Sequence, residues 1–134
     1  MRIALVSCTK NKKSGAHPAI DLYTSTWFRY ATQFATKHCD EWRILSAKHN
    51  LLHPGRVIDN YDCSLHSMSA TERQAWASRT ADQILSTWNN GEIVMLAGNI
   101  YRQHLIPLLG RYSICIPLEG LGIGQQIKWL KENT

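Results

Sequence analysis

Short apolar runs recur along the chain, and each one stops abruptly at polar or glycine-rich residues. The runs occupy residues 3–6, 42–45, 93–96 and 114–117. An apolar run of this length is typical of a buried strand, and a strand covered on both faces lacks polar alternation. We therefore expect strands over about 2–7, 42–46, 92–97 and 112–116.

The segments between these runs carry the spacing of amphipathic helices, which predicts helices over about 25–38, 70–89, 99–109 and 122–132. Ser69 and Glu72 form a capping-box pattern at the start of the second helix, and Pro107 limits the third. Residues 47–68 show no periodicity, and irregular stretches of this length are often functional.

Alternating strands and helices predict an α/β fold, a three-layer αβα sandwich with a mainly parallel four-stranded sheet. The length of 134 residues and the lack of a linker favour a single domain over residues 1–134. No apolar stretch approaches the roughly 20 residues that cross a bilayer, and the first residues lack the apolar region of a secretory signal. We expect a soluble, cytoplasmic protein without a membrane partner.

Basic residues outnumber acidic ones by 15 to 10, for a formal net charge of +5. This balance favours an anionic partner such as nucleic acid or a nucleotide. The four cysteines form no C-x-x-C pair and are expected to be reduced thiols. His49, His53, Cys63 and His66 match no compact zinc spacing, so no metal and no cofactor is expected. The oligomeric state stays open.

Reactive side chains follow every predicted strand. The carboxyl ends of parallel strands open onto one edge of a sheet, where ligands bind, so four clusters are expected to form one site. After the first strand, Cys8, Lys10 and Lys12 are suited to hold a phosphate or polarise a base carbonyl. The alternative is a solvated basic loop with Cys8 packed in the core, and activation of Cys8 as a thiolate ranks below a binding role.

Lys48 follows the second predicted strand directly. Burying a lysine is unfavourable unless it has a partner or a function, which makes Lys48 the first candidate for catalysis or anion binding. The alternative is a structural ion pair with Asp59 or Asp62.

The next candidates stand at the starts of two helices. Tyr23 and Ser25 precede the first helix, where Tyr23 is suited to stack on a base or to pack in the core, and Ser25 is most simply an N-cap. Asn99, Tyr101 and Arg102 begin the third helix, where backbone amides already favour anions. Arg102 is equally compatible with a surface position.

The last cluster is a glycine turn after the fourth strand. It contains Glu119, Gly120, Gly122, Gly124 and Gln125, and it matches the dinucleotide pattern G-x-G-x-x-G only loosely. Three glycines let a ligand approach the backbone closely, with Glu119 at the same edge. The alternative is a tight turn into the last helix.

Six segments form a set that spans nearly the whole chain: 7–12 (SCTKNK), 21–25 (DLYTS), 44–52 (ILSAKHNLL), 61–62 (YD), 96–102 (LAGNIYR) and 117–124 (PLEGLGIG). They resemble a family of small bacterial and phage domains of unknown function. The family pattern is commonly S-C-S-K-x-K and S-A-K-Y-G-L-L, where this chain has Thr9, His49 and Asn50.

More distantly, the Cys–Lys loop and the order of elements look like the uracil-DNA-glycosylase-like fold. Members of that fold include the lysine-transferring domain of archaeosine synthase and the peroxide-stress YaaA-like DNA-binding proteins. Those relatives act on bases in DNA or RNA, or bind DNA. The active-site motifs of uracil glycosylases are absent here, so the likeness concerns the fold and does not fix the activity.

The leading hypothesis is therefore a DNA glycosylase-like enzyme that cleaves the N-glycosidic bond of a modified or damaged base, with DNA favoured over RNA and the choice between them left open. Residues expected to hold phosphates, the departing base or the bound base are Lys10, Lys12, Arg102, Tyr23 and His49. Residues expected to stabilise charge or position water are Lys48, Asp59, Asp62 and Glu119. The alternatives are a non-catalytic DNA- or RNA-binding module and a small-molecule nucleotide or nucleoside enzyme that binds phosphate at residues 120–124.

Overall fold

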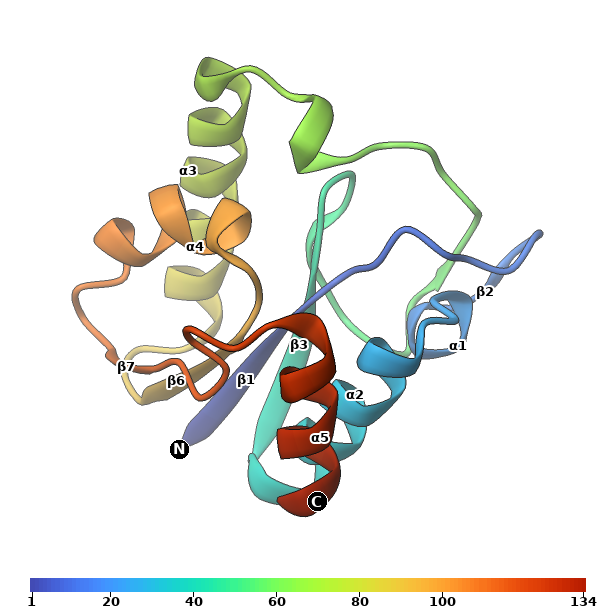
Figure 1. The fold of residues 1–134 in the computed structure, drawn as a ribbon. Coiled ribbons are helices and arrows are strands. Elements are labelled where there is room, and N and C mark those ends of the chain that lie inside the picture. Colours follow the sequence, from blue (N-terminus) through green and yellow to red (C-terminus); the bar gives the residue numbers. More distant parts are fainter.

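The computed structural model describes every residue from 1 to 134. Its central sheet has five strands in the order β4-β3-β1-β6-β7 (Figure 1). β1 (Arg2–Ser7), β3 (Glu41–Ser46), β6 (Glu92–Leu96) and β7 (Ser113–Cys115) run parallel, which confirms the four predicted parallel strands. β4 (Asn50–Leu52) pairs antiparallel with β3, so the predicted total of four strands is wrong.

The additional strand exists because the chain turns sharply before it. Asn50 has φ 59°, in the left-handed region that glycine and asparagine tolerate best. Its side-chain amide donates to Thr80 Oγ1 at 3.0 Å, which anchors the turn to α3 (Ala70–Thr87). Asparagine therefore adopts the conformation that glycine adopts most easily and adds a side-chain anchor. A strand of three residues is too short to show periodicity, which is why the pattern missed it.

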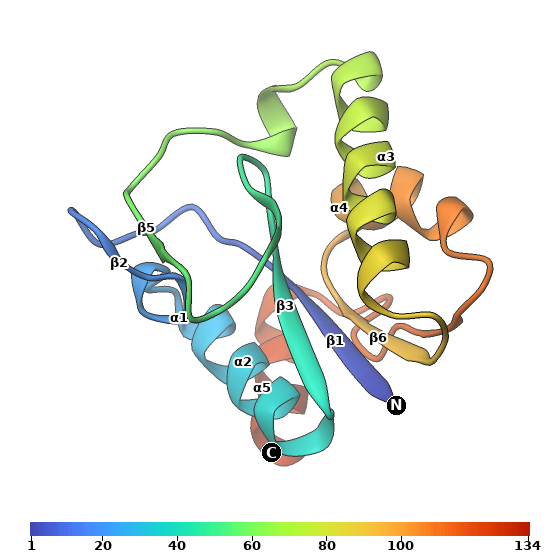
Figure 2. The same cartoon turned by 180° about the vertical axis from the view of Figure 1, so that it is seen from behind.

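One pair of helices covers each face of the sheet, so the molecule has three layers (Figures 1 and 2). α2 (Thr26–His38) and α5 (Ile123–Glu132) pack against each other on one face. α3 and α4 (Asn99–Leu105) pack together on the other. The mixed α/β class and the mainly parallel sheet agree with the sequence prediction.

The apolar runs are continuous because alternate side chains enter two different cores. In β1, Ala4 and Val6 belong to the core beneath α2 and α5, whereas Ile3 and Leu5 belong to the core beneath α3 and α4. All four side chains are fully buried. This explains why no polar position interrupts the run.

Two helices end earlier than their patterns indicate. α4 stops at Leu105 and continues as a 3₁₀ turn, Ile106–Leu108, because Pro107 has no backbone N–H and clashes with the preceding turn. α3 stops at Thr87 because Trp88 is extended, and its indole N–H donates to Glu41 Oε2 at 2.9 Å. None of the helices combines the length and apolar character needed to cross a membrane.

The segment 47–68, expected to be irregular, carries short elements besides β4. β5 (Val57–Ile58) pairs antiparallel with β2 (His17–Pro18), and α1 (Ala19–Leu22) follows β2 directly. A single 3₁₀ turn occupies Leu65–Ser67. These elements tie the loop after β1 to the loop after β4, and together the two loops overhang the carboxyl edge of the sheet (Figure 2).

The predicted capping box is present at the start of α3. Glu72 N–H donates to Ser69 Oγ at 3.1 Å, and Ser69 N–H donates to Glu72 Oε1 at 3.0 Å. We expect Ser69→Ala to lower the free energy of unfolding by about 1 kcal/mol in urea denaturation, because the Glu72 amide loses its acceptor. Ser86→Ala, on the exposed side of the same helix, is the control; an equal loss there would contradict the capping role.

Candidate functional site

A pocket of about 1060 Å³ opens where β1 ends. This volume is at the upper end of the range for small-ligand sites. One wall is the loop after β1, the other is the loop that follows β5, and Tyr101 of α4 closes the pocket between them. The lining residues are 8–12, 60–64, 66, 67 and 101. The position agrees with the prediction that ligands bind at the carboxyl edge of the sheet.

A chain of buried hydroxyl groups lies behind one wall. Tyr61 Oη lies 2.6 Å from Tyr23 Oη and 2.8 Å from Ser46 Oγ, and the backbone N–H of His49 donates to Ser46 Oγ at 3.0 Å. The network joins the end of β3 to both loops of the pocket, so Tyr61 has a fixed position. The alternative prediction for Tyr23 is thereby confirmed, because this ring packs in the core.

Burial keeps these tyrosines uncharged. It raises the pKa of Tyr23 to about 12 and raises the pKa of Tyr61 further. His49 packs edge-on against Tyr61 with 5.4 Å between ring centroids, and burial, with Arg56 and Lys48 nearby, lowers its pKa. The ring of His49 is therefore a neutral packing group behind Tyr61 at neutral pH.

Two ammonium groups lie beside the Tyr61 ring. Lys12 Nζ is 4.6 Å from the ring centroid and Lys48 Nζ is 5.9 Å from it, both within the range of cation–π attraction. Lys12 also donates to the carbonyl of Lys10 at 3.2 Å, and it forms no ion pair. The lysines of this wall therefore form no ion pair, which suits an anionic ligand.

Cys8 and Tyr101 line the pocket side by side. Cys8 Sγ lies 3.3 Å from Tyr101 Oη, and the Tyr101 ring packs edge-on against Trp76 with 5.7 Å between centroids. Burial raises the pKa of Tyr101, and nearby Cys8 raises it to a smaller extent. The phenol therefore keeps its proton at neutral pH. Cys8 is half-buried. It packs against the core beneath α2 and α5 and also lines the pocket, so both predicted environments apply to it in part.

The predicted site residues separate into groups. Cys8, Lys10, Lys12, Asp62 and Tyr101 line the first pocket. A second cavity of about 480 Å³ includes Ser25, and a third of about 220 Å³ includes Asn99, Arg102, Glu119 and Gly120. The predicted residues that line none of these three cavities are Lys48, Asp59, Gly122, Gly124, Gln125, Tyr23 and His49.

Lys48 does not have the environment that its position in the sequence implied. It lies in the tight turn between β3 and β4, its side chain is exposed, and it pairs with neither Asp59 nor Asp62. Exposure removes the desolvation cost on which its selection rested. Both the premise of a buried lysine and the alternative of an ion pair are therefore wrong.

Two other predicted residues have structural roles. Ser25 is the N-cap of α2, where its Oγ accepts from Phe28 N–H at 3.1 Å. Gln125 Oε1 accepts from Gly122 N–H at 3.1 Å at the start of α5. Of the three glycines only Gly120 has a positive φ, 80°, and lies in the turn. Gly122 is the N-cap of α5, and Gly124 lies in the first turn of that helix.

The residues that the sequence reasoning missed come from the loop after β5 and from the middle of the β1 loop. They are Thr9, Asn11, Asn60, Tyr61, Cys63, Ser64, His66 and Ser67. Two signals were available among the family-like segments: the Tyr61-Asp62 pair, and the segment 7–12, which contains Thr9 and Asn11. Cys63 and His66 share the pocket, but no three His, Cys, Asp or Glu side chains are arranged to hold a metal ion.

Comparison with known proteins identifies the family of the chain that forms these cavities. A model described as "Family of unknown function (DUF6884)" matches residues 3–132. The chain belongs to this family. The DUF6884 match therefore contains all the residues that line the three cavities.

One relative of this DUF6884 protein is "Uncharacterized protein YfjM" of Bacillus subtilis (strain 168). The two sequences are 31% identical over an alignment of 144 positions, which covers 96% of this chain and 92% of the relative. No solved structure matches the chain. The likeness to the uracil-DNA-glycosylase-like fold therefore stays a prediction.

Proposed function

We propose that this protein is a base-processing enzyme that cleaves the N-glycosidic bond of a modified or damaged base in DNA. The observation that carries the proposal is the charge arrangement of the first pocket. Asp62 is the only carboxylate among its lining residues, and it lies on the wall facing the loop of Lys10 and Lys12. A carboxylate beside an anion-binding wall suits a reaction that needs both water activation and stabilisation of a departing anion.

The lysine wall is suited to the phosphate that flanks the target nucleotide. Lys10 is exposed at the mouth, whereas Lys12 is half-buried and held against Tyr61. An ammonium group without a carboxylate partner gains more from a phosphate than a paired one, because no ion pair must be broken first.

The interior of the pocket is suited to an unstacked base. Tyr61 and Tyr101 offer aromatic surface, and Asn11 and Asn60 offer amide groups that can donate to and accept from a base edge. Enzymes that modify a base inside a duplex must first move it out of the stack into such a pocket.

The reaction balances with the groups present. A water oxygen bonds to the sugar C1′ as the bond from C1′ to the base nitrogen breaks, and the base leaves with the bonding electrons. Asp62 accepts the proton that the water loses and offsets the positive charge of the sugar. The protonated Tyr101 phenol, whose oxygen lies 3.3 Å from Cys8 Sγ, would donate its proton to the departing base.

The test is release of free base from DNA substrates that each carry a different modified base. Abasic sites are cleaved by alkali and resolved on a denaturing gel, and released bases are identified by mass spectrometry. We expect release from at least one substrate. Binding without release from any substrate would support the non-catalytic module instead, and turnover of free nucleosides alone would support a small-molecule enzyme.

The lysine wall makes a separate prediction about binding. Lys12→Gln should weaken single-stranded DNA binding about tenfold and reduce the slope of log affinity against log salt by about 0.7, because one phosphate contact is lost. Lys128→Gln removes the same charge from an exposed site on α5 and is the control. Equal losses in both variants would mean that only overall charge matters and that Lys12 has no specific contact.

A further inference from the structure

The three cavities are neighbours along one edge of the sheet, and we refer to them together as the groove. Thr9 lines both the first and the second cavity, and Gly98 and Gln126 line both the second and the third. These shared residues follow β1 and β6 or begin α5, so the groove crosses the carboxyl edge of the sheet. It extends from the first pocket to the turn between β7 and α5.

Two buried polar atoms without hydrogen-bond partners lie along this groove. They are Thr9 Oγ1, at the junction of the first two cavities, and Arg102 Nε, in the third. Buried polar atoms in proteins are nearly always paired, because an unpaired one loses its hydration without compensation. Both atoms are covered in the free protein, so a ligand reaches them only if the side chains shift. Their unpaired state marks Thr9 and Arg102 as residues of the groove whose hydrogen bonding is incomplete.

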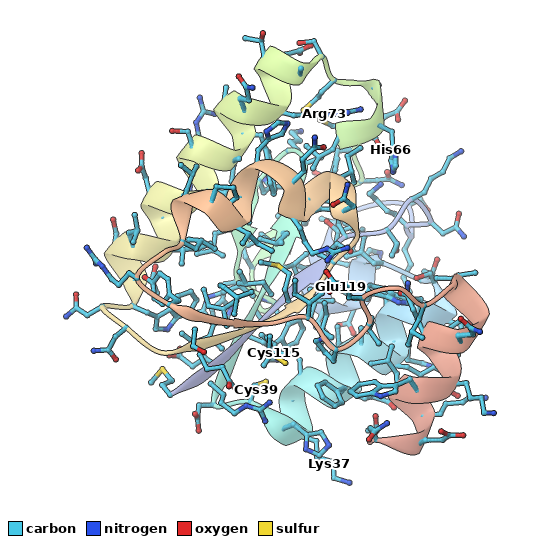
Figure 3. All side chains as sticks on the ribbon, turned by 60° about the vertical axis from the view of Figure 1, so that its left-hand side comes forward. Lys37, Cys39, His66, Arg73, Cys115 and Glu119 are labelled. Atoms are coloured by element: carbon cyan, nitrogen blue, oxygen red, sulfur yellow. The ribbon has the colours of Figure 1, made fainter.

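Arg102 and Glu119 form an ion pair with unequal partners. Arg102 Nη1 donates to Glu119 Oε2 at 3.1 Å, and the exposed fractions of the two side chains are 15% and 65%. Figure 3 shows Glu119 reaching from the connection between β7 and α5 toward the beginning of α4. The arginine is thus anchored in the groove, whereas the glutamate can return to water at little cost when another anion arrives.

The middle of the groove has a different character from its ends. Trp27, Ile123 and Ile127 line the second cavity, and the Ile123 side chain is 63% exposed. Apolar surface between the lysine wall and Arg102 suits a sugar or a base between two phosphates. Lys10 and Lys12 supply the positive charge at one end, and Arg102 supplies it at the other.

We propose that the third cavity is a second phosphate site, in which Arg102 binds the backbone of a single-stranded DNA segment and Glu119 is the counterion that this phosphate displaces. The inference rests on the proposed function in placing the target base in the first pocket. It defines the substrate as a polynucleotide strand that spans the groove, as opposed to a free nucleotide that fills only the first pocket.

The test compares thymidine monophosphate with a fluorescently labelled oligothymidylate long enough to span the groove. Arg102→Gln should weaken oligonucleotide binding roughly 10- to 100-fold and lower its salt slope by about 0.7, because a charge-assisted phosphate contact is lost. Glu119→Gln should strengthen oligonucleotide binding, because Arg102 loses its competitor. Neither change should alter the affinity for the mononucleotide.

Control variants separate these effects from general charge and from folding. Arg79→Gln on the surface of α3 and Glu132→Gln at the end of α5 make the same charge changes at exposed positions away from the groove. Arg102→Lys keeps the charge without the planar fork, so it should bind the oligonucleotide with intermediate affinity. If Arg102→Gln fails to fold, Arg102→Lys and the surface variant Glu119→Gln still decide the matter.

The outcomes distinguish this inference from the proposed function. Opposite effects of Arg102→Gln and Glu119→Gln on the oligonucleotide support the second phosphate site even if no modified base is ever released. Equal effects on mononucleotide and oligonucleotide, or no effect of either variant on the oligonucleotide, overturn it even if base release is observed.

Discussion

Asp62→Asn is expected to reduce the rate of base release by about 10²- to 10⁴-fold, the usual contribution of a general base. The amide has nearly the shape of the carboxylate but can neither accept the proton of the attacking water nor offset positive charge on the sugar. Because Asp62 is exposed within the pocket wall, the change leaves no buried group unpaired, and the fold should be retained. Single-turnover assays under saturating enzyme measure the effect on chemistry directly.

Binding should move in the opposite direction from catalysis. Removing a negative charge from the pocket should leave DNA affinity unchanged or raise it, because Lys10 and Lys12 then act on the phosphate without an opposing carboxylate. Asp59→Asn is the matched control, since Asp59 lies on the same loop and lines none of the three cavities. If Asp62→Asn releases base at the wild-type rate and Cys8→Ser releases none, the thiol of Cys8 and not Asp62 is the catalytic group.

The parallel part of the sheet was predictable because its signal is local. Each of the four parallel strands is mainly apolar, with Arg43 in β3 as the one interruption of an apolar run, so a short window of sequence is enough to recognise it. β4 was not predictable, because it depends on the left-handed conformation of Asn50 and on the hydrogen bond from Asn50 to Thr80, which is 30 residues away. A three-residue strand carries too little pattern to compensate.

The same distinction explains which site residues were found. Cys8, Lys10 and Lys12 follow a strand immediately, so the rule for parallel sheets places them at the ligand-binding edge. The opposite wall comes from a loop whose path depends on contacts distant in sequence. Tyr61 reaches its position through Tyr23 and Ser46, which are 38 and 15 residues away.

Lys48 illustrates what a strand-end position cannot determine. The residue lies where expected, directly after β3, but the tight turn leaves its side chain exposed and outside the three cavities, with Nζ 5.9 Å from the Tyr61 ring centroid. In a crossover loop the same residue would face the carboxyl edge, as Lys10 and Lys12 do. The turn conformation therefore decides between a surface lysine and a ligand-binding one, and Asn50 sets that conformation.

Tyr61 connects the stability of the fold to the geometry of the site. Its hydroxyl joins the network behind the pocket, and its ring lies against Lys12. Tyr61→Phe removes the hydroxyl but keeps the ring, leaving Tyr23 Oη and Ser46 Oγ each with one partner fewer. We expect the free energy of unfolding at neutral pH to fall by about 1–3 kcal/mol.

Stability should also fall steeply in alkali, and Tyr61→Phe should reduce that steepness. An unfolded tyrosine ionises near pH 10, whereas burial raises the pKa of Tyr23 to about 12 and also raises those of Tyr61 and Tyr101. From pH 10 upward the unfolded chain loses these protons while the folded protein keeps them. Rising pH therefore favours unfolding, and the stabilisation is complete only below about pH 10.

Each such tyrosine contributes about 1.4 kcal/mol per pH unit within its window, so three together contribute up to about 4 kcal/mol per pH unit. Urea denaturation at intervals from neutral pH to about pH 12 measures the slope in wild type and in Tyr61→Phe. Cysteines and other groups that titrate in this range are common to both proteins, so the difference in slope isolates one phenol. Equal slopes would show that Tyr61 ionises in the folded protein as readily as in the unfolded chain, and the pocket wall would then be open to water.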